Sequence, residues 1–367
     1  MFTLTDEFGP AKIVYINEPT IDLKGILVVD NVATGPAIGG LRMALDVSLE
    51  ECVRLARAMT LKNAVAGLAH GGGKSVLFGD PKMNRSKKET LIRCFAYALR
   101  GESDYIFGPD MGTDEDCMAW VKDEIGRAVG LPREIGGIPL DLIGATGWGL
   151  FHAVDIALQY CNFDLEGARI VIQGFGAVGK HAARFLTDHG AVLVGVSDTK
   201  GSLYSPDGLD VDTLIGLKEV GKSIIEAPQG TKGAAEDVID MECDIWIPAA
   251  RPDVLHEGNI QRLRTKLVAQ GANIPMTYGA EKYLHQQGVL VLPDIIANAG
   301  GVICASMEYH SASLSASMQT IEEKLRKNTS EVLTMARNND LLPRDAAVQL
   351  SQKRIKKAMD LKRWNIL

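Results

Sequence analysis

Three glycines between two apolar runs constrain most strongly what this 367-residue chain can fold into. Gly174, Gly176 and Gly179 follow the apolar run 170–172 in the spacing G-x-G-x-x-G. Apolar residues then recur at helical spacing, and a second apolar run covers residues 192–196. This order of strand, tight glycine turn, helix and strand predicts a βαβ unit of the kind that binds dinucleotides.

Each glycine meets a physical need of such a site. The first takes a turn that is closed to residues with a Cβ, the second lets the backbone approach a pyrophosphate, and the third allows close packing of helix and strand. The pyrophosphate then lies at the helix N-terminus, where free N–H groups and the helix dipole favour negative charge.

Asp198 ends the second predicted strand, about twenty residues past the glycines, where a carboxylate accepts hydrogen bonds from the adenosine ribose and repels a 2′-phosphate. The pattern therefore predicts a dinucleotide site that prefers NAD. NADP is not excluded, because Lys200 follows two residues later and could meet a phosphate.

The composition excludes several other partners. The chain has 46% apolar and 23% charged residues and a formal net charge of -7, with no basic cluster that would indicate nucleic-acid binding. Its apolar runs are only as long as strands, so we expect no membrane span. The N-terminal residues lack the basic start and apolar stretch of a signal peptide, which predicts a cytoplasmic protein.

The cysteines and histidines indicate no metal site. Six cysteines are widely scattered with no C-x-x-C pair, and the seven histidines show no H-x-x-x-H spacing. We therefore expect reduced thiols and no structural metal.

The chain is long enough for two domains of the α/β class. Residues 131–149 are rich in glycine and proline and form the best candidate for a hinge. We expect an N-terminal α/β domain at 1–140 and a dinucleotide-binding domain at 141–330, with helices at about 330–367 packing back on the first domain. Alternating apolar runs and helical segments over 168–294 predict a parallel, doubly wound Rossmann sheet.

Two lysines and an aspartate of the first domain lie where elements end or on glycine-rich loops. A capping box at 48–51 predicts a helix that ends near Lys62, and three successive glycines place Lys74 on a loop before the strand 75–78. Asp110 follows another short strand and is flanked by glycines.

Two further local patterns concern turns and helix starts. Gly39 and Gly40 predict a turn, and a second capping box at 86–89 predicts the start of the next helix.

Lysines on loops are usually solvated, but three adjacent glycines suggest that a ligand or another backbone segment comes close. A lysine in a closed apolar cleft has a lowered pKa and can act as a base near neutral pH, while a second, charged lysine can hold a carboxylate. A nearby aspartate can move protons. These are the acid–base groups needed to oxidise an amine, with a nicotinamide cofactor as hydride acceptor, and to hydrolyse the resulting imine.

The sequence also resembles the glutamate/leucine/phenylalanine/valine dehydrogenase family along almost the whole chain. The matching motifs are Gly39-Gly40-x-Arg42, Met59-Thr60-x-Lys62-Asn63, Gly72-Gly73-Lys74, Pro109-Asp110-Met111-Gly112-Thr113, Ala145-Thr146-Gly147, Gln173-Gly174-Phe175-Gly176-x-Val178-Gly179, Gly271-Ala272-Asn273 and Pro293-Asp294-x-x-Ala297-Asn298-Ala299-Gly300-Gly301-Val302.

The resemblance implies a reversible oxidative deamination and a role for each residue of the first domain. Lys62 would bind the substrate carboxylate, with Gly40 beside the substrate. Lys74 would activate the water that attacks the imine, and Asp110 would move protons to and from the amine nitrogen. Arg42 is interpreted as a structural ion-pair residue and is left out of the site.

The resemblance also assigns the nicotinamide end of the cofactor to the second domain. Thr146, Asn273 and Asn298 would position the ring, so that hydride passes from Cα to C4. A homo-oligomer assembled through the N-terminal domain, a hexamer or octamer, is a further implication.

The predicted substrate pocket departs from that of the glutamate enzymes. Those enzymes carry a lysine before the Gly-Gly pair and a serine three residues after the valine of Gly-Gly-Val, and both bind the distal carboxylate. Ile38 and Ala305 stand at these positions. A γ-carboxylate there would lose its partners, at a cost on the order of several kcal/mol. With Gly108 and Val302 as further lining residues, we predict an apolar L-amino acid of leucine, valine or phenylalanine type.

Two alternatives stay open. Residues 109–113 and 118–120 look more like the glutamate branch, and Ser306 lies next to the expected serine position, so a short-form glutamate dehydrogenase is the first alternative. A non-catalytic NAD-binding regulator is the second, although its expected signature, the loss of the lysines or of Asp110, is missing.

Overall fold

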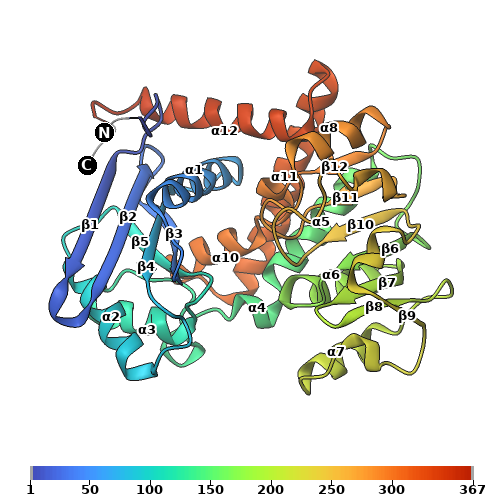
Figure 1. Cartoon of the computed structure of the whole chain (residues 1–367). Helices are drawn as coiled ribbons and strands as arrows, with labels where there is room; N and C mark the ends of the chain where they lie inside the picture. Colours follow the sequence, from blue (N-terminus) through green and yellow to red (C-terminus); the bar gives the residue numbers. More distant parts are fainter. Residues whose placement is uncertain (1–2, 365–367) are drawn as a thin grey trace. The chain divides into compact units, whose positions relative to one another are not determined.

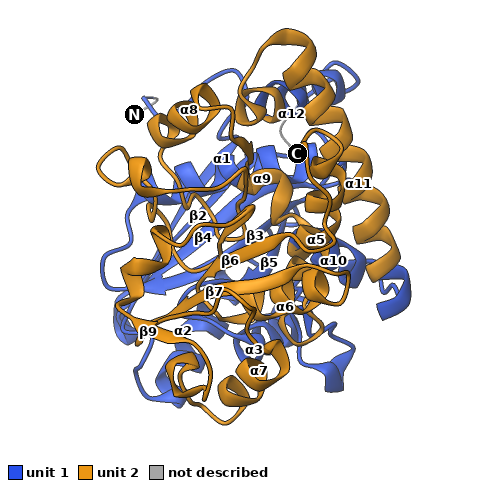
Figure 2. Ribbon diagram, turned by 90° about the vertical axis from the view of Figure 1, so that its right-hand side faces the viewer, with its two compact units in different colours: residues 1–140, 302–317, 348–367 blue, residues 141–301, 318–347 orange. Residues whose placement is uncertain are grey.

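The computed structural model describes residues 3–364 (Figure 1). The chain forms two compact units, coloured separately in Figure 2. Unit 1 comprises Met1–Leu140, Val302–Ser317 and Val348–Leu367, and unit 2 comprises Asp141–Gly301 and Met318–Ala347. The first domain is therefore assembled from three separate stretches of the sequence.

Unit 1 is built on a sheet in the order β1-β2-β4-β3-β5. Its strands are β1 (Lys12–Glu18), β2 (Leu23–Asn31), β3 (Ala37–Ala44), β4 (Gly71–Phe78) and β5 (Tyr105–Pro109). β1, β2 and β4 pair antiparallel, while β3 runs parallel to both β4 and β5. The neighbouring strands β3, β4 and β5 carry Ile38, Lys74 and Gly108, respectively.

Helices cover both faces of this sheet. They are α1 (Leu49–Val65), α2 (Arg85–Ala98) and α3 (Glu115–Ile125). Ile26 and Val28 of β2 pack in one buried cluster with Ala56 of α1, whereas Leu27 packs in another with Phe95 of α2. Because successive side chains of a strand point to opposite faces, a strand buried on both sides reads as a continuous apolar run.

The predictions of a turn at Gly39 and Gly40 and of a loop before Lys74 are wrong. Both segments are strands, β3 and β4. A Cβ on Gly39 would overlap the carbonyl of Gly73, and one on Gly72 would overlap the backbone of Thr60 in α1. The glycines therefore let another strand and a helix approach closely, which is the backbone alternative left open above.

The helix starts agree with the predicted caps in one case and not in the other. Ser48 caps α1 by accepting a hydrogen bond from Glu51 N (3.2 Å). The cap of α2 is Asn84, whose side chain accepts from Ser86 N (2.9 Å), so the capping box at 86–89 is wrong. Asn84 therefore caps the helix in place of the predicted Ser86, through a bond to the second residue of the helix.

Unit 2 contains a seven-stranded sheet in the order β12-β11-β10-β6-β7-β8-β9. Its strands are β6 (Arg169–Gln173), β7 (Val192–Asp198), β8 (Gly201–Tyr204), β9 (Thr231–Gly233), β10 (Ile245–Pro248), β11 (Leu267–Ala269) and β12 (Leu290–Leu292). The five strands from β12 to β7 are parallel. β6 lies between β7 and β10, so the strand order reverses there, as at the ligand-binding crevice of doubly wound sheets.

The sheet is mixed where a purely parallel one was expected. β8 and β9 run antiparallel at one edge, because Asp198 pairs directly with Gly201 and only a short turn separates β7 from β8. A parallel neighbour would need a long crossover, which this turn does not provide.

The helices of unit 2 and the C-terminal helices complete the fold. They are α4 (Leu140–Ile143), α5 (Ala145–Leu158), α6 (Ala177–Thr187), α7 (Val211–Glu219), α8 (Tyr278–Gln286), α9 (Asp294–Ala297), α10 (Gly300–Tyr309), α11 (Leu314–Asn339) and α12 (Pro343–Met359). Short 3₁₀ turns are Pro19–Ile21, Arg133–Ile135, Ile224–Glu226, Ala235–Ile239 and Ile260–Arg262. Unit 1 takes up most of α10 and the last part of α12, whereas most of α11 belongs to unit 2. Across residues 3–364, no helix combines the length and apolarity needed to cross a membrane.

Candidate active site

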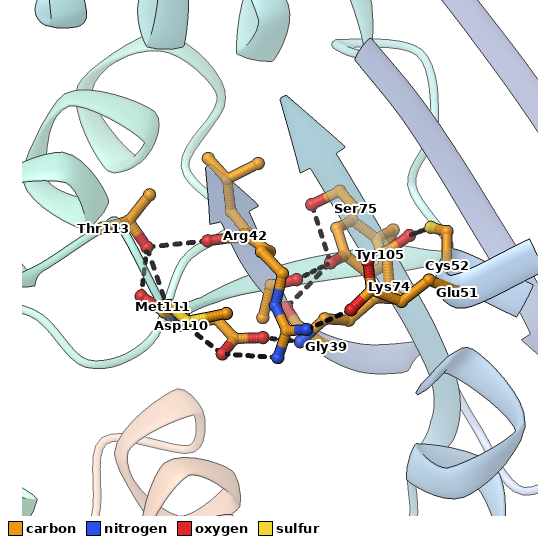
Figure 3. A network of polar contacts seen from close by, with 12 residues as sticks. Gly39, Arg42, Glu51, Cys52, Lys74, Ser75, Tyr105, Asp110, Met111 and Thr113 are labelled. Atoms are coloured by element: carbon orange, nitrogen blue, oxygen red, sulfur yellow. Dashed lines mark hydrogen bonds and ion pairs between the residues drawn. The ribbon is translucent and has the colours of Figure 1, made fainter. Parts of the chain in front are cut away.

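Lys74 and Asp110 contact each other at the centre of a polar network in unit 1 (Figure 3). Lys74 lies within β4, and Asp110 begins the loop that follows β5. The Lys74 side chain is 7% exposed and that of Asp110 is 20% exposed. The structure thus brings together the two residues that the sequence predicts to be catalytic.

Burial sets the protonation of Lys74. It lowers the pKa of the ammonium from 10.5 to about 7, and the positive charge of Arg42 acts in the same direction. The carboxylate of Asp110 favours the ammonium and is the nearest acceptor for its proton. Lys74 can therefore lose and regain a proton near neutral pH, as a general base must.

Arg42 is a member of this network that the sequence interpretation left out. Its Nη2 lies 3.5 Å from Asp110 Oδ1, and its Nη1 donates to Glu51 Oε1 at 2.5 Å. Asp110 therefore faces two cations, Lys74 on one carboxylate oxygen and Arg42 on the other. The motif Gly39-Gly40-x-Arg42 could have indicated this place, because a strand residue two positions after Gly40 points to the same side of the sheet.

The loop around Asp110 is fixed by Thr113. Asp110 N donates to Thr113 Oγ1 (3.0 Å), which itself donates to Leu41 O in β3 (2.7 Å). Met111 N donates to Asp110 Oδ1 (2.6 Å). These bonds hold the carboxylate toward β3 and β4, where Lys74 lies.

Gly40 and Lys62 border the same network. A Cβ on Gly40 would lie 2.8 Å from Asp110 Cβ and 3.1 Å from Lys74 Nζ, so only glycine leaves the pair its space. Lys62 lies in the last turn of α1, is 8% exposed, and its charge contributes to the lowered pKa of Lys74. A second buried cation is thus close to the Lys74 and Asp110 pair.

Two of the four residues predicted to read the substrate side chain, Ile38 and Ala305, belong to one apolar cluster. Ile38 of β3 and Ala305 of α10 pack together with Ile106 and Val129, and Tyr309 packs against this cluster. Val302 precedes Ala305 by about one helical turn, and Gly108 pairs with Gly40 across β3 and β5. Ala305 is 9% exposed and Ile38 is 3% exposed, so both side chains of the cluster are buried.

The glycine turn of unit 2 connects β6 to α6. Gly174 has φ 94°, where a Cβ would approach Ala250, and a Cβ on Gly179 would overlap Gly174 O. At Gly176, the N-cap of α6, nothing in the described part of the chain lies within 4 Å of an added Cβ. The turn therefore leaves open space at a helix N-terminus, as a pyrophosphate requires.

Asp198 ends β7, but protein groups already occupy its carboxylate. Ser223 Oγ lies 2.9 and 3.0 Å from the two oxygens, Ile224 N donates at 3.1 Å, Lys200 N at 2.9 Å and Lys218 Nζ at 3.1 Å. Burial opposes ionisation, but these donors outweigh it and lower the pKa of Asp198. The side chain is only 6% exposed, so the expected bonds to a ribose would compete with Ser223 and Lys218.

The residues assigned to the nicotinamide end come from three segments of unit 2. Thr146 lies in the first turn of α5, and a Cβ on Gly301 would lie 3.0 Å from its Oγ1. Asn273 and Asn298 follow β11 and β12, and Asn298 Nδ2 donates to Asn273 Oδ1 (2.9 Å).

Two buried acceptors at the carboxyl ends of the strands have no partner among the described residues. They are Gln173 Oε1 at the end of β6 and Asn298 Oδ1. A buried acceptor without a donor is costly, and a carboxamide N–H₂ of a ligand would satisfy it. Together with the open N-terminus of α6, these acceptors fit a nicotinamide dinucleotide.

Comparisons with known proteins agree with this geometry. Residues 14–127 match the Glu/Leu/Phe/Val dehydrogenase dimerisation domain, and residues 136–363 match the glutamate/leucine/phenylalanine/valine dehydrogenase model. An NAD-specific glutamate dehydrogenase of Staphylococcus aureus is 33% identical over 91% of this chain and 85% of its own. An NADP-specific glutamate dehydrogenase of Saccharolobus shibatae is 37% identical over 76% of this chain and 69% of its own.

A solved structure extends the likeness to the fold. The hetero-hexameric glutamate dehydrogenase of Thermus thermophilus, in its Leu-bound form, superposes with a TM-score of 0.86 and 29% identity over 96% of this chain and 90% of that chain. The dimerisation-domain model spans Lys74 and Asp110, and the second model spans the glycine turn. Because the two models together match most of the chain, it belongs to the glutamate/leucine/phenylalanine/valine dehydrogenase family.

Proposed function

We propose that this amino acid dehydrogenase catalyses the NAD-dependent, reversible oxidative deamination of an apolar L-amino acid to its 2-oxoacid and ammonium. The observation that carries the proposal is the cluster of Ile38, Ala305, Ile106 and Val129. A substrate side chain against these residues meets no charge, so an aliphatic or aromatic group is favoured over a carboxylate.

The network of unit 1 supplies the proton chemistry of this reaction. Lys62 holds the substrate α-carboxylate, and Asp110 takes the proton that the substrate ammonium loses. Neutral Lys74 removes a proton from the water that adds to the imine carbon. Asp110 then protonates the amine nitrogen of the resulting carbinolamine, so that the C–N bond breaks, ammonia leaves and the hydroxyl loses its proton to give the 2-oxoacid. When bound, the nicotinamide ring accepts the hydride that leaves Cα.

The groups of unit 2 support binding of a nicotinamide dinucleotide. Gly174, Gly176 and Gly179 give the pyrophosphate access to the N-terminus of α6. Thr146, Asn273 and Asn298 hold the carboxamide end. NAD is proposed because the lowered pKa keeps Asp198 ionised and a fixed negative charge disfavours a 2′-phosphate, although Lys218 partly neutralises it.

Glutamate is the second candidate substrate. The relatives compared above are named glutamate dehydrogenases, which favours it. The apolar cluster opposes it, because neither Ile38 nor Ala305 can offer a γ-carboxylate an ion pair or a hydrogen-bond donor. The non-catalytic regulator is disfavoured by the contact of Lys74 with Asp110, and measurable turnover would exclude it.

Association into oligomers is supported by the dimerisation-domain match and by the hexameric structure. We propose a homo-oligomer, and multi-angle light scattering of the purified protein tests it. A monomer at micromolar concentration would contradict this part of the proposal.

The pocket assignment is tested by giving this chain the glutamate-type residues. In Ile38→Lys/Ala305→Ser, the ratio of kcat/KM for 2-oxoglutarate to that for 4-methyl-2-oxopentanoate should rise about a hundredfold or more. Ile135→Lys is the matched control, because Ile135 is 51% exposed and lies outside the cluster. An unchanged ratio in the double variant would remove Ile38 and Ala305 from the pocket.

A further inference from the structure

Arg344 lies between two buried carboxylates at the start of α12. Its Nε donates to Glu281 Oε1 and Oε2 at 2.9 and 2.8 Å, and its Nη2 lies 2.9 Å from Asp294 Oδ1. The exposed fractions of the three side chains are 19% for Arg344, 3% for Glu281 and 4% for Asp294. All three residues belong to unit 2.

Gln270 completes this network. Its Oε1 accepts from Arg344 Nη2 (2.9 Å) and from Asp294 N (3.1 Å), and its Nε2 donates to Glu281 Oε1 (2.6 Å). Gln270 directly follows β11, and Asp294 lies two residues after the end of β12. Doubly wound sheets bind ligands at the carboxyl ends of their parallel strands. Arg344 contacts Gln270 and Asp294 at this edge of the sheet.

Asp294, which Arg344 and Gln270 hold in place, also contacts the segments that carry the two asparagines of the candidate cofactor site. Its Oδ2 accepts from Ile274 N (2.8 Å), and its carbonyl accepts from Asn298 N (3.1 Å). Ile274 has φ 48°, a left-handed conformation that is unfavourable for a β-branched residue and needs such support. Asn273 precedes Ile274 and accepts from Asn298 Nδ2.

A buried group of one cation and two carboxylates is a poor way to stabilise a fold, because desolvation of the charges offsets their attraction. Such a network fixes conformation instead, and here the conformation in question is that of the segment 273–274 and of Asn298. Asn298 Oδ1 is buried without a partner among residues 3–364, which points to a ligand donor.

We propose that Arg344 is a positioning residue for the nicotinamide end of the cofactor, acting through Asp294 on Asn273 and Asn298. The inference rests on the proposed function, since it takes these asparagines as cofactor ligands. It assigns a role in the cofactor site to a residue of the C-terminal helix α12, 74 positions beyond Gln270 in the sequence.

The test compares Arg344→Lys with the parent in NADH titrations of the intact protein followed by fluorescence. Lysine keeps the positive charge but cannot bridge Glu281, Gln270 and Asp294 in one plane. We expect the NADH dissociation constant to rise about tenfold or more, while the KM of the 2-oxoacid stays within about twofold. Arg262→Lys, which alters the exposed pair with Asp240, is the matched control and should leave NADH binding unchanged.

A double-mutant cycle separates positioning from a general loss of structure. If Arg344 acts through the asparagines, Arg344→Lys should have little further effect on NADH binding in an Asn298→Ala background. If Arg344→Lys fails to fold, Glu281→Gln takes its place, because glutamine keeps an acceptor for Arg344. Its effect on NADH binding should likewise be small in an Asn298→Ala background. Two results would overturn the inference. One is that the two substitutions raise the NADH dissociation constant independently, so that the double variant shows the product of the single effects. The other is that both Arg344→Lys and Glu281→Gln keep the NADH affinity of the parent.

Failure of the proposed function has a different signature. If Asn298→Ala alone keeps parental NADH affinity, the asparagine is not a cofactor ligand and the inference fails with it. Turnover of apolar 2-oxoacids by the parent protein would still stand in that case, so the two failures are distinguishable.

Discussion

The ammonium of Lys74 contacts the carboxylate of Asp110 although 36 positions separate the two residues in the sequence. One comes from the middle of β4 and the other from the end of β5, and β3 lies between these strands. Gly40 of β3 leaves the space in which the two side chains meet. The pair therefore depends on the sheet order of unit 1.

Replacing Lys74 by alanine should lower kcat on the order of 10²–10⁴-fold, because the base that activates water is lost. The NADH dissociation constant should change little, since Lys74 belongs to unit 1 and the proposed cofactor residues to unit 2. Steady-state kinetics and NADH titration check both parts, with the exposed Lys87→Ala as control. Turnover within tenfold of the parent would show that Lys74 is not the base.

The pH profile should report Lys74. Because its pKa is lowered to about 7 and the neutral amine is the active form, kcat/KM for deamination should rise with pH through about 7 and then level off. Burial is the main cause and the charge of Arg42 is the next, so Arg42→Met should raise the pKa of Lys74 and move the profile to higher pH. A profile that stays in place, or moves to lower pH, would contradict this coupling.

Replacing Gly40 by alanine should disrupt the contact between Lys74 and Asp110, although both residues remain. The new Cβ would lie 2.8 Å from Asp110 Cβ, closer than such atoms come, so the Asp110 loop must shift. We expect a loss of about a hundredfold in kcat with cofactor binding retained. At Gly101 an added Cβ meets no described residue within 4 Å, and Gly101→Ala should behave as the parent.

Asp198→Ala should weaken NAD binding more than NADP binding. The substitution removes a fixed negative charge and frees Lys218, whose ammonium then favours a 2′-phosphate. Isothermal titration with both cofactors measures the ratio, and the exposed Asp212→Ala is the control. Equal changes in both affinities would remove Asp198 from the choice between the cofactors.

Local patterns sufficed for much of the fold and for the pieces of the candidate site. The β6, glycine turn and α6 unit was predictable because strand, glycines and helix follow one another within a few residues, and the structure confirms it. β7 begins at Val192, where the second apolar run begins, and ends at Asp198, two residues beyond that run.

The errors arose where the cause lies far away in the sequence. Three glycines before Lys74 indicated a loop because the close approach of Thr60 in α1 is not visible in a local pattern. Apart from Lys200, the partners of Asp198 come from residues 218–224, and Arg344 reaches Gln270 from α12. Arg42 does form the ion pairs expected of a structural residue, with Glu51 and Asp110, but which carboxylates it meets depends on the neighbouring strands.

The most direct test of the central claim is NADH oxidation by the parent protein with excess ammonium and a panel of 2-oxoacids. The panel comprises 2-oxoglutarate, 3-methyl-2-oxobutanoate, 4-methyl-2-oxopentanoate, phenylpyruvate and indolepyruvate. The cluster of Ile38 and Ala305 predicts the highest kcat/KM for one of the four apolar acids. A higher value for 2-oxoglutarate would contradict the apolar pocket and identify the protein as a short-form glutamate dehydrogenase.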